Sequence, residues 1–552
     1  MSGYSHSNSP ELGWVVQKFG GTSVGKFPDK VRQIGWARHD AVMHVWMRAA
    51  PPVSMRQLEA NALWTQRLRT ISSSKPLPDL RINRHVANQS VIEQVCRGIE
   101  WWCLIGVYAM LKAVGAAANA EEEQFAHMDE AKKLIKDICK DHVAAAEAYV
   151  TEPLLRQKLI TRIEAECQEL IEYIIATKRF NLEINARSKD RVISFGEKLA
   201  CLSMTAVLQN NGVDAEYVDL GDVLHCEAAD PLDASFYKTA VEAFRKKLCA
   251  CGTKIPVVTG FFGNVPGSLI DGDIGRGYTD LCSALCAVGL GAEELQIWKE
   301  VDGIFTADPS KVPTARLLTS ITPSEAAELT FYGSEVIHHL TMDQVVRATP
   351  PIPIRIKNVK NPRGTGTIVI PDPILSPSHQ LHRSRSLVHL ADGLHKPPKR
   401  PTAVTIKDDI SVINVHSNKR SLSHGFFARV FSILDRHSIS VDLISTSEVH
   451  VSLAIHSAST RIDAFSSAKR SLEECGDVSV LSDMAILSLV GADMKNMVGV
   501  AGKMFSTLGE HNVNLEMISQ GASEINISCV IDARDADRAM NVLHTHLFTF
   551  LD

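Results

Sequence analysis

The chain lacks the cysteine motifs that are typical of metal sites. Its 12 cysteines are scattered over 552 residues, and none of them forms a Cys-x-x-Cys pair. Cys249 and Cys251 are two residues apart, and Cys282 and Cys286 are four apart, without a second pair or histidines nearby. Structural zinc sites need about four such ligands at regular spacing, so no zinc site is expected. We interpret these residues as reduced intracellular thiols.

Long apolar runs are also absent. The first ten residues are polar and contain no hydrophobic segment typical of a secretory signal. The longest apolar run extends from Trp101 to Leu111 and ends at Lys112, whereas a membrane-spanning helix needs about 20 residues. We therefore expect a cytoplasmic protein that does not enter the membrane.

The chain carries no excess of positive charge. Its net charge of −5 gives no reason to expect nucleic acid or an anionic membrane surface as a partner. Hydrophobic residues make up 45% and charged residues 22%, which is typical of a globular protein. The length predicts about three domains.

Strand and helix patterns alternate in the middle of the chain. The predicted helices cover 133–176, 191–208, 237–248 and 279–288, and the predicted strands cover 215–218, 255–259 and 294–298. This alternation predicts the α/β class, with a mostly parallel sheet sandwiched by helices.

An internal repeat follows a Ser-, His- and Pro-rich linker. The stretch Phe431–Ser445 recurs as Phe505–Ser519, offset by 74 residues. Each copy predicts the order strand, helix, strand, strand, helix, as in a small ferredoxin-like unit. We interpret Leu434 and Leu508 as core residues.

A glycine-rich bend follows the first predicted strand. Residues 15–25 read Val-Val-Gln-Lys-Phe-Gly-Gly-Thr-Ser-Val-Gly, just before a predicted helix. Such a bend presents backbone N–H groups and the positive end of a helix to an anion. The lysine precedes the glycines, unlike in a Walker A loop, and GxGxxG is absent. Taken alone, the segment is either a phosphate site or a tight turn.

Four motifs together carry a resemblance to one family. They are Lys18–Gly25, Phe195-Gly-Glu-Lys198, Gly275-Arg-Gly-Tyr-Thr-Asp280 and Trp298-Lys-Glu-Val-Asp-Gly-Ile-Phe-Thr-Ala-Asp-Pro309. The chain resembles fungal monofunctional aspartate kinases, in which an amino-acid-kinase domain of the carbamate-kinase-like type precedes two ferredoxin-like ACT domains. The resemblance implies a tail at 1–13, a catalytic domain at 14–372, a linker at 373–402 and ACT domains at 403–476 and 477–552.

The implied reaction transfers the γ-phosphoryl group of ATP to the side-chain carboxylate of L-aspartate, giving 4-phospho-L-aspartate and ADP. It is the first step towards threonine, methionine and isoleucine. The aspartate carboxylate is already ionised at neutral pH, so the site needs no general base. It must instead position two anions and neutralise their charge.

The resemblance assigns roles around this chemistry. Lys18 would neutralise the transferring phosphoryl group, Arg276 would bind the α-carboxylate of aspartate, and Glu197 would bind its α-ammonium. Asp280 would organise the lysine, although a helix-capping role is the alternative. The loop residues that would cradle the phosphates are Gly20, Gly21, Thr22 and Ser23, with Thr22 also near the substrate.

The resemblance also places the nucleotide's ribose and base near Lys299, Glu300, Phe305 and Asp308. Asp308-Pro309 is alternatively a simple turn. Mg²⁺ is expected with the phosphates, and the sequence shows no dedicated protein cage for it. Adjacent His338 and His339 would face different sides of a helix, so we expect a structural role rather than a metal site.

In the repeats, the resemblance implies a site for an amino-acid effector, threonine rather than lysine. The residues it implies are Ser423, Gly425, Phe426, Phe427, Val441 and Asp442 in the first copy, and Asn512, Asn514, Gln520 and Glu524 in the second. A helix start after Ser423 suits a carboxylate, although ordinary capping is the alternative. Because ACT units commonly pair between chains, a homo-oligomer is expected.

Residues 36–110 depart from the family pattern. The resemblance implies a buried second strand and a substrate-binding turn here, but the chain has five tryptophans without clear periodicity. The segment is either a translated non-coding sequence or a divergent insertion. We expect it to be poorly ordered or badly packed and predict weak or absent kinase activity. The alternative function is a catalytically impaired amino-acid sensor; the ACT repeats and Arg276 argue against a glutamate 5-kinase.

Overall fold

The structure is a computed structural model. It describes residues 14–19, 43–48, 121–180, 186–224, 232–263, 265, 277–332, 337–370, 400–417, 425–447, 449–457, 462–521 and 525–548. The chain divides into two compact units. The first contains residues 1–303 and 338–393, and the second contains residues 304–337 and 394–552.

The first unit is built on a mixed sheet, in which three neighbouring strand pairs are parallel and three are antiparallel. Its strands follow the order β3-β4-β2-β1-β5-β7-β8. Their bounds are β1 Trp14–Phe19, β2 Met43–Arg48, β3 Ala215–Val218, β4 Ile255–Thr259, β5 Glu294–Lys299, β7 Ile354–Asn358 and β8 Thr367–Val369. The neighbours β1 and β5, β5 and β7, and β3 and β4 pair in parallel. Strand β4 is buried along its whole length, as expected of a strand covered on both faces.

Helices pack against this sheet, which confirms the predicted α/β class. Their bounds are α5 Glu121–Tyr149, α6 Pro153–Arg179, α7 Ala186–Ile193, α8 Phe195–Asn210, α9 Ala234–Cys249, α10 Tyr278–Leu290 and α12 His339–Arg347. Helix α8 contacts β3 and β4, and α10 contacts β1 and β5. None of the helices in the described ranges is both long and apolar enough to cross a membrane.

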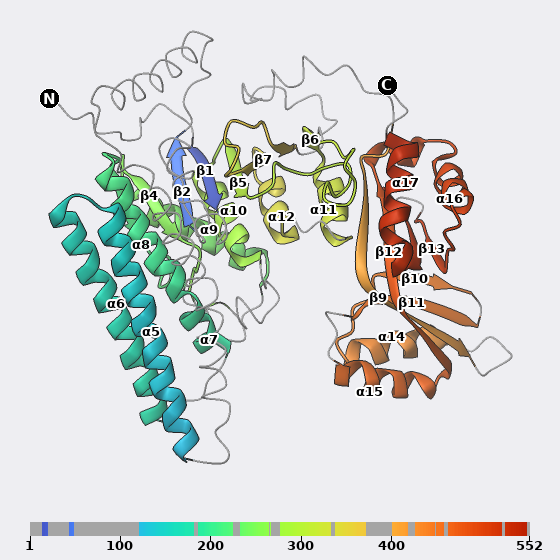
Figure 1. Ribbon diagram of the computed structural model, residues 1–552, viewed down its shortest axis with the longest axis horizontal. Coiled ribbons are helices and arrows are strands. Elements are labelled where there is room, and N and C mark those ends of the chain that lie inside the picture. The colour runs from blue at the N-terminus through green and yellow to red at the C-terminus, as the bar shows by residue number, and fades with distance from the viewer. Residues whose placement is uncertain are drawn as a thin grey trace, which may run out of the picture. The chain divides into compact units, whose positions relative to one another are not determined.

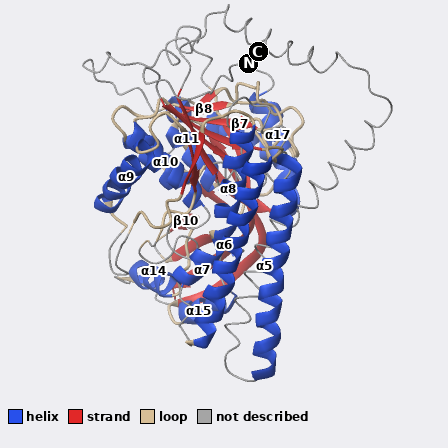
Figure 2. Ribbon diagram, turned by 90° about the vertical axis from the view of Figure 1, so that its left-hand side faces the viewer, coloured by secondary structure: helices blue, strands red, loops and turns tan. Residues whose placement is uncertain are grey.

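The helix predicted at 133–176 is in fact a pair. Helices α5 and α6 lie side by side (Figure 1; Figure 2) and share an apolar core. The break falls just before Pro153, a residue that is favoured at the first position of a helix. The side-chain oxygen of Asn210 accepts the N–H groups of Thr151 at 2.9 Å and Glu152 at 3.0 Å, which satisfies the turn.

Strand β2 comes from the anomalous segment 36–110. It lies between β1 and β4 and is antiparallel to both. The expected loss of a second strand is therefore wrong for these six residues; the remainder of the segment lies outside the described residues. The physical reason is that β1 and β4 must pair their backbone N–H and C=O groups, and an antiparallel strand does so without a particular sequence.

The direction of β2 decides where its ends lie. His44 pairs with Lys18, and Arg48 pairs with Trp14. The chain therefore leaves β2 at the edge of the sheet where β1 begins, opposite to Lys18.

The second unit contains the repeat, and each copy follows the predicted element order. The first copy comprises β9 Ala403–Ser417, α14 Phe426–Arg436, β10 Leu443–Thr446, β11 His450–His456 and α15 Ile462–Glu473. The second comprises β12 Gly476–Val490, η3 Ala492–Asn496, α16 Val500–Glu510, β13 Met517–Ser519, β14 Asn526–Asp532, η4 Ala533–Asp535 and α17 Ala536–Phe548. Both copies share one six-stranded sheet of order β10-β11-β9-β12-β14-β13.

The segment 304–337 packs with the repeats. It contains β6 Ser320–Ile321 and α11 Pro323–Phe331. The carbonyl oxygen of Thr306 accepts the N–H of Val404 at 2.8 Å, and the Thr405 hydroxyl donates to the carbonyl of Tyr332 at 2.9 Å. The predicted domain limits stay predictions, but this part of the predicted catalytic domain belongs to the compact unit of the repeats.

A buried histidine holds the start of that segment. His544 of α17 lies 2.8 Å from the Thr306 hydroxyl through Nε2 and 3.2 Å from the Thr314 hydroxyl through Nδ1. Burial, together with nearby Arg316, lowers the pKa of the His544 imidazole. Both ring nitrogens are therefore used to fix the segment against α17.

Glu325 holds the other end of the segment. Its Oε2 accepts the N–H of Thr322 at 2.9 Å, which completes a capping box at the start of α11. Its Oε1 accepts the Thr402 hydroxyl at 2.5 Å and the N–H of Ala492 at 2.8 Å. One buried carboxylate thus joins α11 to residues next to β9 and β12.

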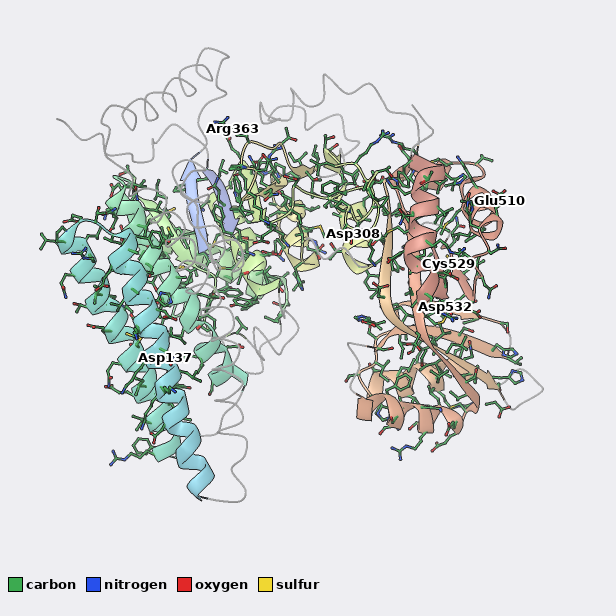
Figure 3. The ribbon with its side chains drawn as sticks, in the orientation of Figure 1. Asp137, Asp308, Arg363, Glu510, Cys529 and Asp532 are labelled. Atoms are coloured by element: carbon green, nitrogen blue, oxygen red, sulfur yellow. The ribbon has the colours of Figure 1, made fainter. Side chains whose placement is uncertain are left out.

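We expect Glu325→Ala to destabilise the protein by about 3 kcal/mol, because it leaves several buried donors without an acceptor. Urea unfolding followed by circular dichroism measures the change. Glu510→Ala, which removes an exposed carboxylate at the end of α16 (Figure 3), is the control and should shift stability by less than about 0.5 kcal/mol. Equal stability of the two variants would contradict the role of Glu325.

Candidate active site

A buried ion pair joins the end of β1 to the start of α10. The Nζ of Lys18 lies 2.6 Å from Oδ1 of Asp280, and the two side chains are only 9% and 10% exposed. A buried lysine needs such a partner because an uncompensated charge is costly away from water. The two residues that the sequence predicted to act together are therefore in direct contact.

The local sequence explains why Asp280 lies there. Helix α10 begins after Gly277, which supplies no side-chain cap, and Asp280 lies in the first turn. A carboxylate in the first turn is favoured by the positive end of the helix dipole. Asp280 therefore faces two positive charges, the helix end and the ammonium of Lys18.

A second carboxylate, Glu197, lies close to this pair. It sits in the first turn of α8, and its Oε1 accepts the hydroxyl proton of Tyr278. Burial raises the pKa of Glu197 to about 8, although Tyr278, the backbone of Phe261 and the charge of Lys18 act in the opposite direction. Its Oε2 is buried and has no hydrogen-bond partner among the described residues. A ligand ammonium would supply the missing donor and the missing positive charge.

Tyr278 was not singled out from the sequence. Burial, followed by the neighbouring Glu197, raises the pKa of its hydroxyl well above the usual value, so the hydroxyl stays protonated and donates. The signal that could have identified it is its position within the Gly-Arg-Gly-Tyr-Thr-Asp motif, at the first residue of α10.

His338 has the structural role expected from the sequence. Its Nδ1 accepts the N–H of Leu340 at 3.4 Å and caps α12. A Cβ at Gly277 would come within 2.4 Å of this ring, so only glycine permits the close approach. In the described part of the chain, no group of three or more His, Cys, Asp or Glu residues could hold a metal ion.

Lys299 and Glu300 follow at the end of β5, beside β1. Phe19 and Trp298 are register partners, and their rings stack at 5.5 Å. Both candidates are half-buried. The ends of β1 and β5 therefore bring Lys299 and Glu300 to the same edge of the sheet as Lys18.

The other two nucleotide candidates, Phe305 and Asp308, belong to the second unit. Phe305 forms an isolated bridge with Leu317. The carboxylate of Asp308 (Figure 3) accepts the N–H of Ser310 at 2.8 Å and its hydroxyl at 2.7 Å. Asp308 thus closes a turn, which is the alternative considered from the sequence.

Several predicted site residues lie outside the described residues. They are Gly20, Gly21, Thr22, Ser23, Arg276, Ser423 and Glu524. Their roles stay predictions.

The effector candidates of the first repeat gather around the start of α14 and the loop before β10. Gly425 precedes α14 with a φ of 84°, a left-handed conformation that favours glycine. Phe426 is buried in the core of this repeat and Phe427 is exposed. Val441 packs against the same core, and Asp442 forms an ion pair of 2.8 Å with Lys407.

In the second repeat, the candidates follow α16. Asn512 adopts a φ of 55°, and Asn514 donates to Glu516 at 2.7 Å. Gln520 is exposed after β13. No contact among the described residues brings these three side chains together.

Comparisons with known proteins define the class of this chain. The model of the amino acid kinase family matches residues 115–358, and an ACT domain model matches residues 487–547. E. coli aspartokinase III, solved with aspartate and ADP and again with lysine and aspartate, is 26% and 25% identical with TM-scores of 0.58 and 0.60. These structures cover 80% of this chain, which covers 91% and 90% of them. The fold is that of an amino acid kinase followed by an ACT-like region.

Sequence relatives show to which family of amino acid kinases the chain belongs. Aspartate kinase FUB3 of Gibberella fujikuroi is 49% identical over 97% of this chain and 98% of its own length. The aspartokinase of Saccharomyces cerevisiae is 43% identical over 99% of this chain and 94% of its own length. The chain belongs to the aspartate kinase family.

The Lys18–Asp280 pair also predicts a stability effect. We expect Asp280→Asn to destabilise the protein by about 3 kcal/mol, because it leaves a buried ammonium opposite a neutral amide. The double variant Lys18→Met/Asp280→Asn should recover part of this loss, since neither charge remains. Thermal and urea unfolding measure both. A double variant less stable than Asp280→Asn would contradict this account of the pair.

Proposed function

We propose that this aspartate kinase joins ATP and L-aspartate at the edge of the sheet where Lys18, Asp280 and Glu197 meet. Lys18 neutralises the phosphoryl group during transfer, and Asp280 holds Lys18 in place. Glu197 takes the α-ammonium of aspartate, and Arg276 takes the α-carboxylate. The Lys18–Asp280 contact of 2.6 Å is the observation that carries the proposal.

The chemistry of the cluster supports these roles. The reaction brings a polyphosphate and a carboxylate together, so it needs a fixed cation more than a proton acceptor. When no ligand is bound, Asp280 compensates the charge of Lys18 and keeps the lysine buried. Mg²⁺ bound mainly to the phosphates supplies further neutralisation, which requires few protein ligands.

Regulation forms the second part of the proposal. The ACT repeats bind an amino acid, threonine by preference, at the set that includes Gly425 and Asp442. The effector of E. coli aspartokinase III is lysine in the solved complex, so the identity of the effector needs its own measurement. The enzyme works as a homo-oligomer in the cytoplasm, as the paired repeats and the scattered cysteines indicate.

A second candidate function is amino-acid sensing without phosphoryl transfer. The antiparallel direction of β2 favours it, because the chain leaves this strand at the edge opposite to Lys18. The family resemblance implies a substrate-binding turn after a second strand, and the residues that follow β2 lie outside the described ones. An assay that mixes the protein with ATP, aspartate and hydroxylamine measures phosphoryl transfer as aspartyl hydroxamate. Threonine binding without any formation of this product would support the sensing function.

We expect Lys18→Met to lower kcat at least 100-fold, the usual cost of removing one group that stabilises transition-state charge. Aspartyl hydroxamate formation from ATP and aspartate measures it, and threonine titration should remain unchanged. Lys254→Met removes an exposed lysine paired with Glu216 in the same unit and serves as the control. Undiminished turnover in Lys18→Met would remove Lys18 from the mechanism.

The raised pKa of Glu197 predicts a pH dependence. The carboxylate must lose its proton to bind an ammonium, so kcat/KM for aspartate should rise with pH through a pKa of about 8 and level off above it. Glu197→Gln should raise the KM for aspartate about 10- to 100-fold, the worth of a charged hydrogen bond. It should also abolish the rise with pH. If the rise persists in Glu197→Gln, another group titrates.

A further inference from the structure

Only one of the two carboxylate oxygens of Asp442 has a partner among the described residues. Its side chain is 6% exposed, and its Oδ1 lies 2.8 Å from the Nζ of Lys407. Its Oδ2 is buried and has no hydrogen-bond partner among the described residues. Its backbone N–H donates to the carbonyl of Ala454 at 2.8 Å, which fixes the residue at the start of β10.

The unpartnered oxygen defines what can bind there. An ionised carboxylate has acceptor sites on both oxygens, and leaving a buried one empty costs about 1–3 kcal/mol or more. A ligand that brings an N–H donor with a positive charge would satisfy it. The ammonium of a free amino acid is such a group, whereas a second carboxylate would be repelled.

Lys407 links this carboxylate to α11. Its side chain is 16% exposed, and its Nζ also lies 4.5 Å from the ring centroid of Phe331, at the end of α11. A lysine over a ring face is attracted by the ring's quadrupole. Lys407 is thus held from two sides, by a carboxylate of the first repeat and by a ring of the segment 304–337.

We propose that Lys407 is the internal counter-ion that the effector's ammonium displaces at Asp442, and that its displacement from Phe331 transmits effector binding to α11. The inference rests on the proposed assignment of Asp442 to the effector site. It adds Lys407 as a cation that competes with the effector for Asp442. It also adds the contact through which effector binding affects α11.

The charges dictate the direction of the effect. With Lys407 on Oδ1, an incoming ammonium at Oδ2 meets a like charge a few ångströms away, which weakens binding. When Lys407 moves away, the repulsion falls and the contact with the Phe331 ring is lost. Helix α11 lies in the segment 304–337, so the Lys407–Phe331 contact connects the first repeat to that segment.

Threonine titration of the full chain by calorimetry tests whether Lys407 competes with the effector's ammonium for Asp442. Two neutral variants, Lys407→Met and Lys407→Gln, should bind threonine about tenfold more tightly, because the like charge is gone. Lys407→Gln keeps an N–H donor for Asp442, so it tests the same prediction if Lys407→Met does not fold. Lys407→Arg keeps the charge and should bind as the unchanged chain does.

Lys311→Met is the matched control, since Lys311 pairs with Asp408 and Asp537 instead of Asp442. It should leave the affinity for threonine unchanged. Unchanged or weaker threonine binding in both neutral Lys407 variants would overturn the inference.

Asp442→Asn separates the inference from the proposed function. Loss of threonine binding in Asp442→Asn, with no tightening in the Lys407 variants, would keep the effector site and reject the role of Lys407. Normal binding in Asp442→Asn would reject the effector site itself, and the inference with it.

The variant Phe331→Leu tests whether effector binding is transmitted to α11 through the contact between Lys407 and Phe331. This variant removes the ring but keeps an apolar side chain. It should bind threonine within about twofold of the unchanged chain, because the Lys407–Asp442 pair remains, yet show weaker inhibition of kinase turnover by saturating threonine. Full inhibition in Phe331→Leu would reject the transmission through Phe331.

Discussion

The buried contact between Lys18 and Asp280 is the constraint on which the catalytic unit depends. It joins the end of a central strand to the first turn of a helix, and both charges would be costly in that place without each other. The same contact makes the lysine available, because an anionic ligand can take over the compensation that Asp280 provides. Glu197 adds a carboxyl group whose pKa burial raises to about 8.

The second constraint is the partition of the chain into units. The segment 304–337 begins within the motif Trp298–Pro309, yet Thr306, Thr314 and Glu325 in it bond to residues of the repeats and their flanks. His544 uses both ring nitrogens on Thr306 and Thr314, and Glu325 ties α11 to residues beside β9 and β12. The residues that these contacts fix are covalently continuous with β5.

Sequence reasoning reached the elements and contacts that local patterns specify. The strands at 215–218 and 255–259 match the structure, and Lys18 and Asp280 were identified as partners from their motifs. The contact of Tyr278 with Glu197 joins residues 81 positions apart, so no local pattern indicates it. The direction of β2 was not predicted either, because parallel and antiparallel pairing both satisfy the backbone N–H and C=O groups of the neighbouring strands. The packing of 304–337 with the repeats depends on individual buried hydrogen bonds, which periodicity does not encode.

A crystal structure of the full chain with ADP, Mg²⁺ and aspartate would test the central claim most directly. The account predicts the terminal phosphate of ADP within about 4 Å of the Lys18 Nζ, with the aspartate ammonium on Glu197. A nucleotide bound away from the Lys18–Asp280 pair, with that pair undisturbed, would contradict it.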